Sequence, residues 1–460
     1  MEKEKWRFVV LLGKGGISFF SQGLLKSYGI LLPALAIQLQ ASYTVVGLIA
    51  TVQFTATFLL SPFAQMLNQR LGPQPTSLTG GILAGGAICL MYFAQTPLHI
   101  GALFAFAGLG FGMLFQTAYV VLKDHFGDHY GSANTLSVMG TVIGTAALPM
   151  LTKELYEAYG LHGTFVVLGA LTCNLIAVGG TMRYRRGTAR VQSCDADYMA
   201  VRSYEPEEST KNEDQDSITD YCKSNETPND IPCSEHTERS CRHFPGSVME
   251  CVCRFFLELF AIDAIKNERL FACFFFPCQL LMDCVYIGHI IFLVSYGLSI
   301  GIDPTLAPYL TVASAGGGVI ARILLAILLH LKPGWSPQLY VVSNTIATVG
   351  FFFYPVSKSF LYAMCCSVVV GLGLQGSTAS YHGAMGILVG PDNFPGIIAI
   401  SFFGTGLISA ATGATVGYLY EVMQSFETVF MLLGSMTAVI VILSSIYLCI
   451  RRKDSTAAGE

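Results

Sequence analysis

Long apolar runs separated by short polar stretches dominate this sequence. The first run, residues 6–36, exceeds the roughly 20 residues that cross a bilayer as a helix, so it predicts a membrane-spanning helix. Further runs of similar character follow it along the chain. The predicted spans are residues 8–36, 43–66, 76–93, 98–122, 132–151, 163–182, 271–300, 305–329, 337–356, 360–389, 396–418 and 428–450. The pattern therefore predicts an all-α membrane protein with twelve transmembrane helices.

The composition supports this prediction. Hydrophobic residues make up 53% of the 460 residues and charged residues 12%, whereas charged residues approach a quarter of a soluble domain. The net charge of -4 is weak, and no basic patch interleaved with aromatic residues lies outside the membrane borders, so we expect no nucleic-acid partner. The first apolar run is too long for a cleavable signal, which predicts a retained helix. The expected surroundings are membrane lipids.

A polar segment, residues 183–269, interrupts the apolar pattern after the sixth span. It is rich in Glu, Asp, Ser, Asn and Thr and lacks apolar periodicity until Val248, so we expect most of it to be disordered. It separates an N-terminal six-helix half, residues 1–182, from a C-terminal six-helix half, residues 270–450, which a short tail, 451–460, follows. Most Lys and Arg residues of the short loops fall on one side of the predicted spans, against Lys153 and Lys358 on the other. This predicts cytosolic termini and a cytosolic linker.

The two halves contain matching short motifs. Gly108-Leu109-Gly110 recurs at residues 371–373, and Leu155-Tyr156-Glu157 recurs at residues 419–421, with offsets of 263 and 264. Matches in the same order at nearly constant offset indicate an internal repeat. Parallel six-helix repeats are the organisation of major facilitator transporters, in which the substrate lies between the halves near the middle of the bilayer.

Two cationic residues lie inside predicted spans. Lys26 is roughly 15 Å from the end of the first span, and Arg322 is roughly 10 Å from the cytosolic end of the span 305–329. A charge facing hydrocarbon is costly, so both should turn toward a wet cavity or an anionic partner. Arg can give a carboxylate two parallel hydrogen bonds, and Lys is a compact charge, so together they predict an anion-binding path. The alternatives are that Lys26 extends to the outer surface and that Arg322 forms a structural ion pair. Lys14 is expected to reach the cytosolic interface.

The span 271–300 carries two further titratable residues. Asp283 lies about 18 Å and His289 about 27 Å from its inner end. Asp283 either neutralises Arg322 or Lys26 or relays a proton. His289 either carries a proton, since its unperturbed pKa is near 6.5, or is hydrogen-bonded between helices. Both alternatives stay open at this point.

Metal binding and catalysis find little support in the sequence. Asp124, His125, Asp128 and His129 have the i, i+4 spacing of ligands on one helical face, but they lie in a predicted cytosolic loop, and we expect no metal site there. The fourteen cysteines include no C-x-x-C pair, so neither a zinc module nor a disulfide scaffold follows. We expect no cofactor and no enzyme activity, although a non-transporting membrane sensor stays an alternative.

Several stretches resemble the monocarboxylate transporters of the major facilitator superfamily. Residues 6–10, WRFVV, resemble the end of that family's D-G-G-W-G-W motif, and Lys26 falls where its first-helix lysine is expected. Residues 61–81 resemble its S/G-P…N-R-F-G…G-G loop. Arg322 stands at the place of its eighth-span arginine, whereas Gly318 replaces the aspartate that proton-coupled members carry there. In residues 125–144, which resemble a second signature, the sequence 128–130, DHY, replaces a basic triplet.

The resemblance covers nearly the whole chain except the linker and the tails, and it implies a function. We expect a secondary transporter that moves a small organic anion, a monocarboxylate first, across the plasma membrane by alternating access. Because Gly318 lacks a carboxylate, proton coupling stays open. A carrier of an amino-acid-like, zwitterionic or aromatic solute is the alternative within the same fold. Some members of the family need a single-span ancillary glycoprotein, so such a partner stays open too.

Overall fold

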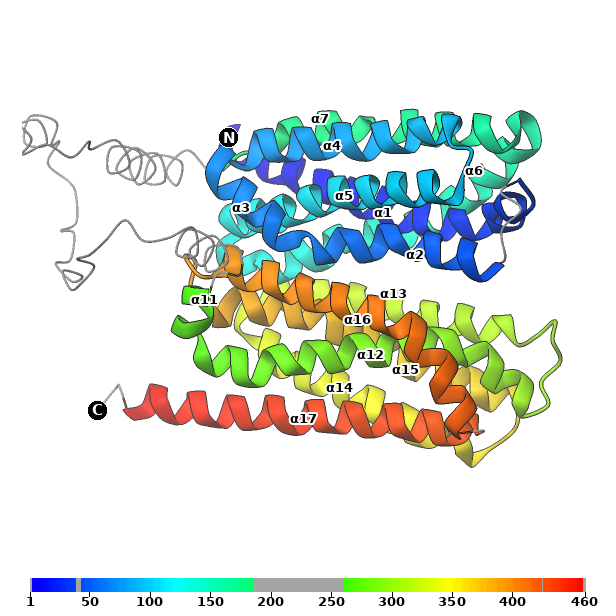
Figure 1. The fold of residues 1–460 in the computed structure, drawn as a ribbon. Helices are drawn as coiled ribbons and strands as arrows, with labels where there is room; N and C mark the ends of the chain where they lie inside the picture. Colours follow the sequence, from blue (N-terminus) through cyan, green and yellow to red (C-terminus); the bar gives the residue numbers. More distant parts are fainter. Residues whose placement is uncertain (1, 39–42, 185–259, 261, 424, 458–460) are drawn as a thin grey trace, which may run out of the picture. The chain divides into compact units, whose positions relative to one another are not determined.

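The fold is that of a computed structural model, which describes residues 2–38, 43–184, 260, 262–423 and 425–457 (Figure 1). All regular secondary structure in these residues is helical. The N-terminal half comprises α1 (Glu2–Gln38), α2 (Tyr43–Leu59), α3 (Ser61–Leu71), α4 (Pro73–Leu90), α5 (Pro97–Phe126), α6 (Tyr130–Thr172) and α7 (Asn174–Thr181). The C-terminal half comprises α12 (Arg269–Ser299), α13 (Pro308–Leu331), α14 (Ser336–Phe353), α15 (Phe360–Leu388), α16 (Phe394–Met423) and α17 (Phe426–Ala457), preceded by the short α11 (Ile262–Asn267).

Every predicted span is helical, which confirms the all-α prediction. Within the described residues, nine helical stretches are long and apolar enough to cross a membrane, and one of them, Pro97–Thr181, has 85 residues and contains three predicted spans. Several boundaries differ from the prediction, and two of the differences follow from particular residues. The second span is divided into α2 and α3 just before Pro62, whose ring cannot continue a helix interior. The fifth and sixth spans share α6, which breaks at Gly160, where φ is +65°.

Most of the predicted linker, residues 185–259, lies outside the described residues, so its expected disorder stays a prediction. The last part of the linker forms α11, a single short helix before α12.

The two halves use the same helix pairings. In the N-terminal half α5 packs against α2 and α4, and α4 packs against α7. In the C-terminal half α15 packs against α13 and α14, and α14 packs against α17. Each pairing joins helices at the same place in its repeat, which agrees with the internal repeat of the sequence.

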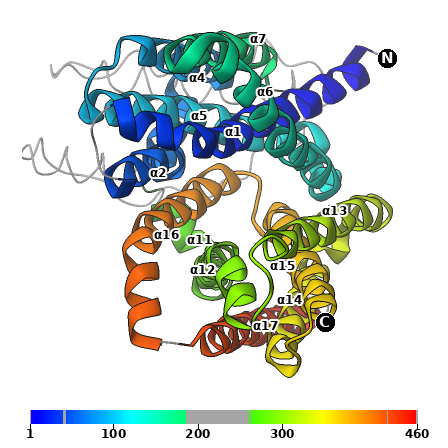
Figure 2. The same ribbon diagram turned by 90° about the vertical axis from the view of Figure 1, so that its right-hand side faces the viewer.

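The halves meet through α2 and α3 against α16, and through α6 against α13 and α15 (Figure 2). We call the side of the bundle at which α1 begins and α17 ends the terminal side (Figure 1). Toward that side, Ser61 Oγ donates to the Ala399 carbonyl at 2.7 Å, Gln116 Nε2 donates to the Pro395 carbonyl at 2.9 Å, and Lys123 Nζ donates to the Gly386 carbonyl. These bonds hold the halves together there, so the structure is closed on its terminal side.

Candidate substrate-binding site

Arg322 lies on α13 where the two halves meet, with 7% of its surface exposed. Its Nη2 donates to Gln375 Oε1 on α15 at 2.5 Å, and Gln375 Nε2 donates to the Tyr286 hydroxyl on α12 at 3.0 Å. Three helices of one half therefore position the guanidinium group. Its acceptor is a neutral amide, so the positive charge of Arg322 is not cancelled by this bond.

Gly318 explains how Gln375 reaches this position. Gly318 lies one turn before Arg322, and a Cβ atom added to it would lie 2.5 Å from Gln375 Cγ. Gln375 thus fills the space that a side chain at position 318 would need. An amide from α15 occupies the place in which the resemblance to monocarboxylate transporters leads one to expect an aspartate from α13.

Lys14 on α1 is completely buried, so the expectation that it reaches the cytosolic interface is wrong. Its Nζ donates to Asn134 Oδ1 and, at 3.0 Å, to Ser137 Oγ, both on α6. The same nitrogen lies 3.8 Å from the centroid of the Tyr119 ring on α5. The physical reason for the burial is that α6 packs along α1 and presents two polar acceptors, while the aromatic face adds a cation–π contact.

A cavity of about 40 Å³ lies between the halves at this place, with room for a few water molecules. Both halves contribute to its wall, which consists of Tyr119, Asn134, Thr135 and Val138 from one half and Arg322, Thr378, Ala379 and His382 from the other. Lys14 lies directly behind Tyr119 and Asn134. Among the described residues, neither Lys14 nor Arg322 bonds to a carboxylate. The cavity is therefore flanked by two buried positive charges with neutral partners.

Lys26 is not brought to this cavity. It follows Lys14 by twelve residues on α1, which places it about 18 Å farther along the helix and about 120° around it. Its side chain is exposed. The basic residue that lies beside the same cavity as Arg322 is therefore Lys14. A role of Lys26 in substrate binding stays a prediction.

Comparison with known proteins shows the family of this chain. A profile of the Major Facilitator Superfamily matches residues 15–393. The chain belongs to the Major Facilitator Superfamily. The predicted twelve-helix major facilitator fold is thereby confirmed, and the chain is a multi-pass membrane protein and a secondary transporter of a small molecule.

Curated relatives named monocarboxylate transporters are similar to this major facilitator protein at low identity. It is 21% identical to monocarboxylate transporter 7 of Homo sapiens over 434 residues, which cover 92% of this chain and 83% of the relative. It is 27% identical to monocarboxylate transporter 11 of Mus musculus over 179 residues, 39% of this chain and 40% of the relative. It is 28% identical to monocarboxylate transporter 13 of Rattus norvegicus over 182 residues, 39% of this chain and 42% of the relative. The predicted resemblance is therefore confirmed.

Asp283 lies in the C-terminal half of this major facilitator protein, half-buried on α12. Its Oδ1 accepts from Gln279 Nε2 at 2.9 Å, and its Oδ2 accepts from Thr405 Oγ1 on α16 at 2.6 Å. Within the described residues it forms no ion pair with Arg322 or Lys26. Of the two open alternatives, direct neutralisation of a cation is therefore not the arrangement seen.

His289 lies six residues after Asp283 on α12 and is 2% exposed. Its Nε2 is 3.2 Å from Ser314 Oγ on α13, and its ring contacts Phe351 and Phe430, with centroids 5.5 and 6.1 Å away. The arrangement seen is thus a histidine hydrogen-bonded between helices, apart from the cavity that Arg322 lines.

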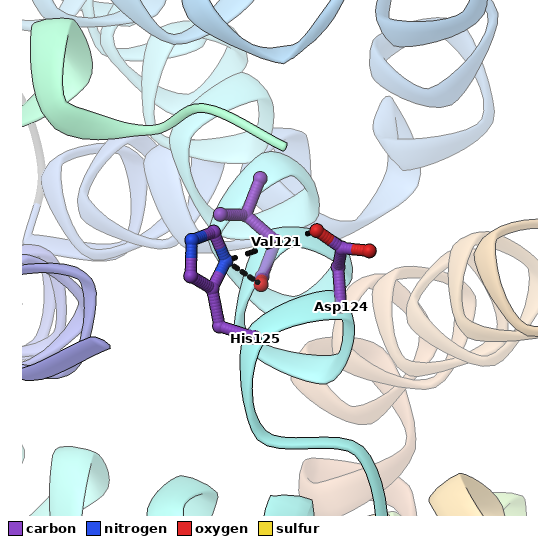
Figure 3. Close-up of polar contacts among 3 residues, drawn as sticks. All are labelled: Val121, Asp124 and His125. Atoms are coloured by element: carbon purple, nitrogen blue, oxygen red, sulfur yellow. Dashed lines mark hydrogen bonds and ion pairs between the residues drawn. The ribbon is translucent and has the colours of Figure 1, made fainter. Parts of the chain in front are cut away.

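Asp124 and His125 lie in the last turn of α5, and Asp128 and His129 follow it, so the four residues do not share one helical face. His125 Nδ1 lies 3.0 Å from the Val121 carbonyl, so it donates to its own helix, and Asp124 Oδ2 lies 3.8 Å from the same nitrogen (Figure 3). The helix ends at Phe126, which removes Asp128 and His129 from its regular spacing. The His129 ring instead lies 5.4 Å from that of His330 in the other half.

Sequence reasoning found Arg322 but missed Lys14 and Gln375. One signal for Lys14 was present, because the apolar stretch that can span the membrane begins at Lys5, nine residues and about 13 Å before Lys14. Asn134 and Ser137, polar residues inside a predicted span, were a second signal. No sequence pattern pointed to Gln375, since its role follows from its packing against Gly318.

Proposed function

We propose that this chain carries a small organic anion, a monocarboxylate first, across the plasma membrane by alternating access. The observation that supports it is the pair of buried cations, Lys14 and Arg322, one from each half, beside one cavity and without a carboxylate partner in the described residues. Two uncompensated charges in a membrane protein are costly unless an anion joins them. The termini and the linker, residues 183–269, would lie in the cytosol.

In the proposed complex the Arg322 guanidinium binds the substrate carboxylate through two parallel hydrogen bonds. Gln375 holds the guanidinium plane in position, and Lys14 contributes a second positive charge through its contacts with Asn134 and Tyr119. The cavity of about 40 Å³ must widen to admit the substrate. Lys26, exposed on the distal part of α1, would attract the anion before it reaches the cavity.

The contacts between the two halves would allow the cavity to widen. The bonds that close the terminal side run from neutral side chains and Lys123 to backbone carbonyls, such as Ser61 to Ala399 and Gln116 to Pro395. Such bonds can be exchanged for bonds to water at a net cost of about 1 kcal/mol each. Rocking of the halves would then open the cavity to the cytosolic side.

We further propose that Asp283 carries the coupling proton. The Thr405 hydroxyl has one hydrogen and two acceptors within reach, Asp283 Oδ2 at 2.6 Å and the Ser401 carbonyl at 3.2 Å. When the carboxyl is ionised, Thr405 donates to it. When the carboxyl is protonated, it donates to Thr405 Oγ1, which then donates to Ser401. Both protonation states are therefore hydrogen-bonded without movement of a heavy atom.

The groups around Asp283 leave its charge unbalanced. Titratable side chains near it are Tyr340 of α14, Tyr381 of α15 and Cys284 of α12 itself. All of them are neutral in their ordinary state. Within the described residues, hydrogen bonds connect Arg322 to α12 through Gln375 and Tyr286.

A second candidate cargo is an aromatic or amino-acid-like solute. Three rings gather beside the cavity: the Tyr119 centroid lies 5.2 Å from that of His382 and 5.0 Å from that of Phe402. Aromatic surfaces of this kind stack well on an aromatic substrate, at about 0.5–1.5 kcal/mol per pair. This solute would use the same Arg322 contact for its carboxylate.

A substrate panel tests the proposal. Uptake of labelled lactate, creatine and aromatic amino acids is measured in a host that lacks such carriers, with and without an inward proton gradient. Expression with and without a single-span ancillary glycoprotein controls for surface delivery. We expect saturable lactate uptake that Arg322→Ala abolishes. Uptake of the aromatic amino acids alone would favour the second candidate, and no flux for any solute in reconstituted vesicles would favour a sensor.

A further inference from the structure

A second cavity, of about 190 Å³, lies on the terminal side of the C-terminal half, away from Arg322. Its wall includes the chain before α12 and the ends of α15 and α17, through Asn267, Glu268, Arg269, Leu270, Phe271, Leu388, Tyr447 and Arg451. The stretches of α12 and α17 that can span a membrane are Arg269–Ser299 and Phe426–Arg452. The cavity therefore lies where both helices reach the membrane boundary, on the side that carries both chain ends (Figure 1).

The two arginines of this cavity have free donors. Arg451 Nη1 donates to the Leu388 carbonyl at 3.2 Å and to the Tyr447 hydroxyl at 3.1 Å, and its Nη2 bonds to no other described residue. Arg269 is exposed and makes neither a hydrogen bond nor an ion pair in the part of the chain that the structure describes. Two guanidinium groups thus line one cavity with unused hydrogen-bonding capacity.

The carboxylate of the cavity is already engaged. Glu268 Oε1 accepts from the Gly390 backbone N–H at 3.0 Å and from Asn393 Nδ2 at 3.2 Å, both in the segment between α15 and α16. Glu268 therefore tethers that segment, and it pairs with neither arginine. The cavity keeps an excess of positive charge.

We propose that this cavity binds the phosphate of an anionic phospholipid headgroup. Guanidinium groups recognise phosphate oxygens through paired hydrogen bonds, and basic pockets between membrane helices bind such headgroups. The position at the membrane boundary, with Leu270, Phe271 and Leu388 in the wall, favours a ligand that also has acyl chains. The volume is below the 300–1,000 Å³ of sites for drug-sized ligands, which suits a headgroup. This inference does not depend on the proposed transport function.

Binding is tested with the full-length protein in detergent, titrated with dioctanoyl phosphatidylinositol 4-phosphate and followed by native mass spectrometry. Dioctanoyl phosphatidylcholine, inorganic phosphate and inositol phosphate form the other arms. We expect saturable binding of the phosphoinositide alone. Each arginine should contribute about fivefold, so Arg269→Ala weakens binding about fivefold and Arg269→Ala with Arg451→Ala about 25-fold. Lys332→Ala, which removes an exposed cation of the same side outside the cavity, should leave binding unchanged.

Two outcomes would overturn the proposal. Equal affinity of the double variant and the natural protein would remove this cavity as the site. Inorganic phosphate that binds as tightly as the lipid and displaces it would assign the cavity to a soluble anion instead. Because Arg451 also bonds to Leu388 and Tyr447, Arg451→Ala could lower the melting temperature, and Arg451→Lys then takes its place. Arg269→Ala removes no side-chain bond to another described residue.

Discussion

Lys14 and Arg322 bring the same charge to the same cavity from opposite halves, but they are held in different ways. Lys14 is enclosed by its own half, with two oxygen partners on α6 and an aromatic face on α5. Arg322 has a single amide partner, Gln375, and lines the cavity itself. Under the proposed function, this difference favours direct contact of Arg322 with the substrate and a supporting charge from Lys14.

The C-terminal half differs at Arg322 from the half that the resemblance to proton-coupled monocarboxylate transporters predicts. A carboxylate at position 318 would neutralise Arg322, whereas Gln375 orients it without removing its charge. Asp283, a carboxylate of the same half, bonds to Gln279 and Thr405 instead. In the proposed mechanism the group that binds the anion, Arg322, and the group that carries the proton, Asp283, are thus separate.

Arg322→Ala should have the largest effect. Loss of one partner of a buried charge-assisted contact costs about 2–5 kcal/mol, so lactate uptake should fall at least ~30-fold. Arg322→Lys keeps the charge without the planar fork and should recover only part of the uptake. Surface biotinylation measures delivery to the membrane in parallel. Unchanged uptake by a delivered Arg322→Ala variant would remove Arg322 from the site.

Lys14→Gln should have the next largest effect. Gln keeps a hydrogen-bonding group for Asn134 and Ser137 but removes the charge, so uptake should fall about tenfold while the melting temperature is not lowered. Ser137→Ala is the matched control, because it removes one of the two hydrogen bonds of Lys14, together with the bond from Ser137 to the Asn134 carbonyl, and keeps the charge. If Ser137→Ala impairs uptake as much as Lys14→Gln, the hydrogen bonds matter and the charge does not.

Gln375 can reach Arg322 because Gly318 has no side chain, and two substitutions at position 318 test this packing. Gly318→Ala should displace Gln375 from Arg322 and lower uptake about fivefold, the value of one hydrogen bond. Gly318→Asp combined with Gln375→Ala should place a carboxylate beside Arg322. Uptake by this double variant should rise more steeply as the external pH falls, because protonation of the new carboxyl frees Arg322 for the substrate. Gly318→Ala with natural uptake would contradict the packing described above.

The positions of Lys14 and Arg322 show how much of the site could be predicted from the sequence alone. Apolar run lengths predicted all twelve spans, because membrane helices must satisfy their backbone groups internally and so need long apolar runs. The same reasoning placed Arg322 inside the span 305–329, and the helix α13 includes it. It failed for Lys14, whose partners Asn134 and Ser137 lie 120 and 123 residues away along the chain. Depth along a helix can be counted from the sequence, but the surface that a side chain faces depends on packing between distant helices.

Asp283→Asn should uncouple transport of the anion from the proton gradient. In electroneutral symport a gradient of half a pH unit supports about threefold accumulation of the anion. Asp283→Asn should reduce this ratio toward one while exchange of labelled anion at equal pH continues. Thr405→Val, which removes the hydroxyl that serves both protonation states, should have the same effect. Accumulation that survives both substitutions would assign the proton to another group.

Lys26→Gln should have the smallest effect and so measures how far the binding path extends along α1. Lys26 is exposed and about 18 Å from Lys14, so its charge acts on the approaching anion through solvent. Uptake at low ionic strength should fall about twofold, the size of an exposed ion-pair contribution, and the difference should vanish at high salt. Lys14→Gln should lower uptake at both ionic strengths, because its charge is shielded from salt by burial. A salt-independent loss of tenfold in Lys26→Gln would instead place Lys26 in direct contact with the substrate, and the site would then extend beyond the cavity between Lys14 and Arg322.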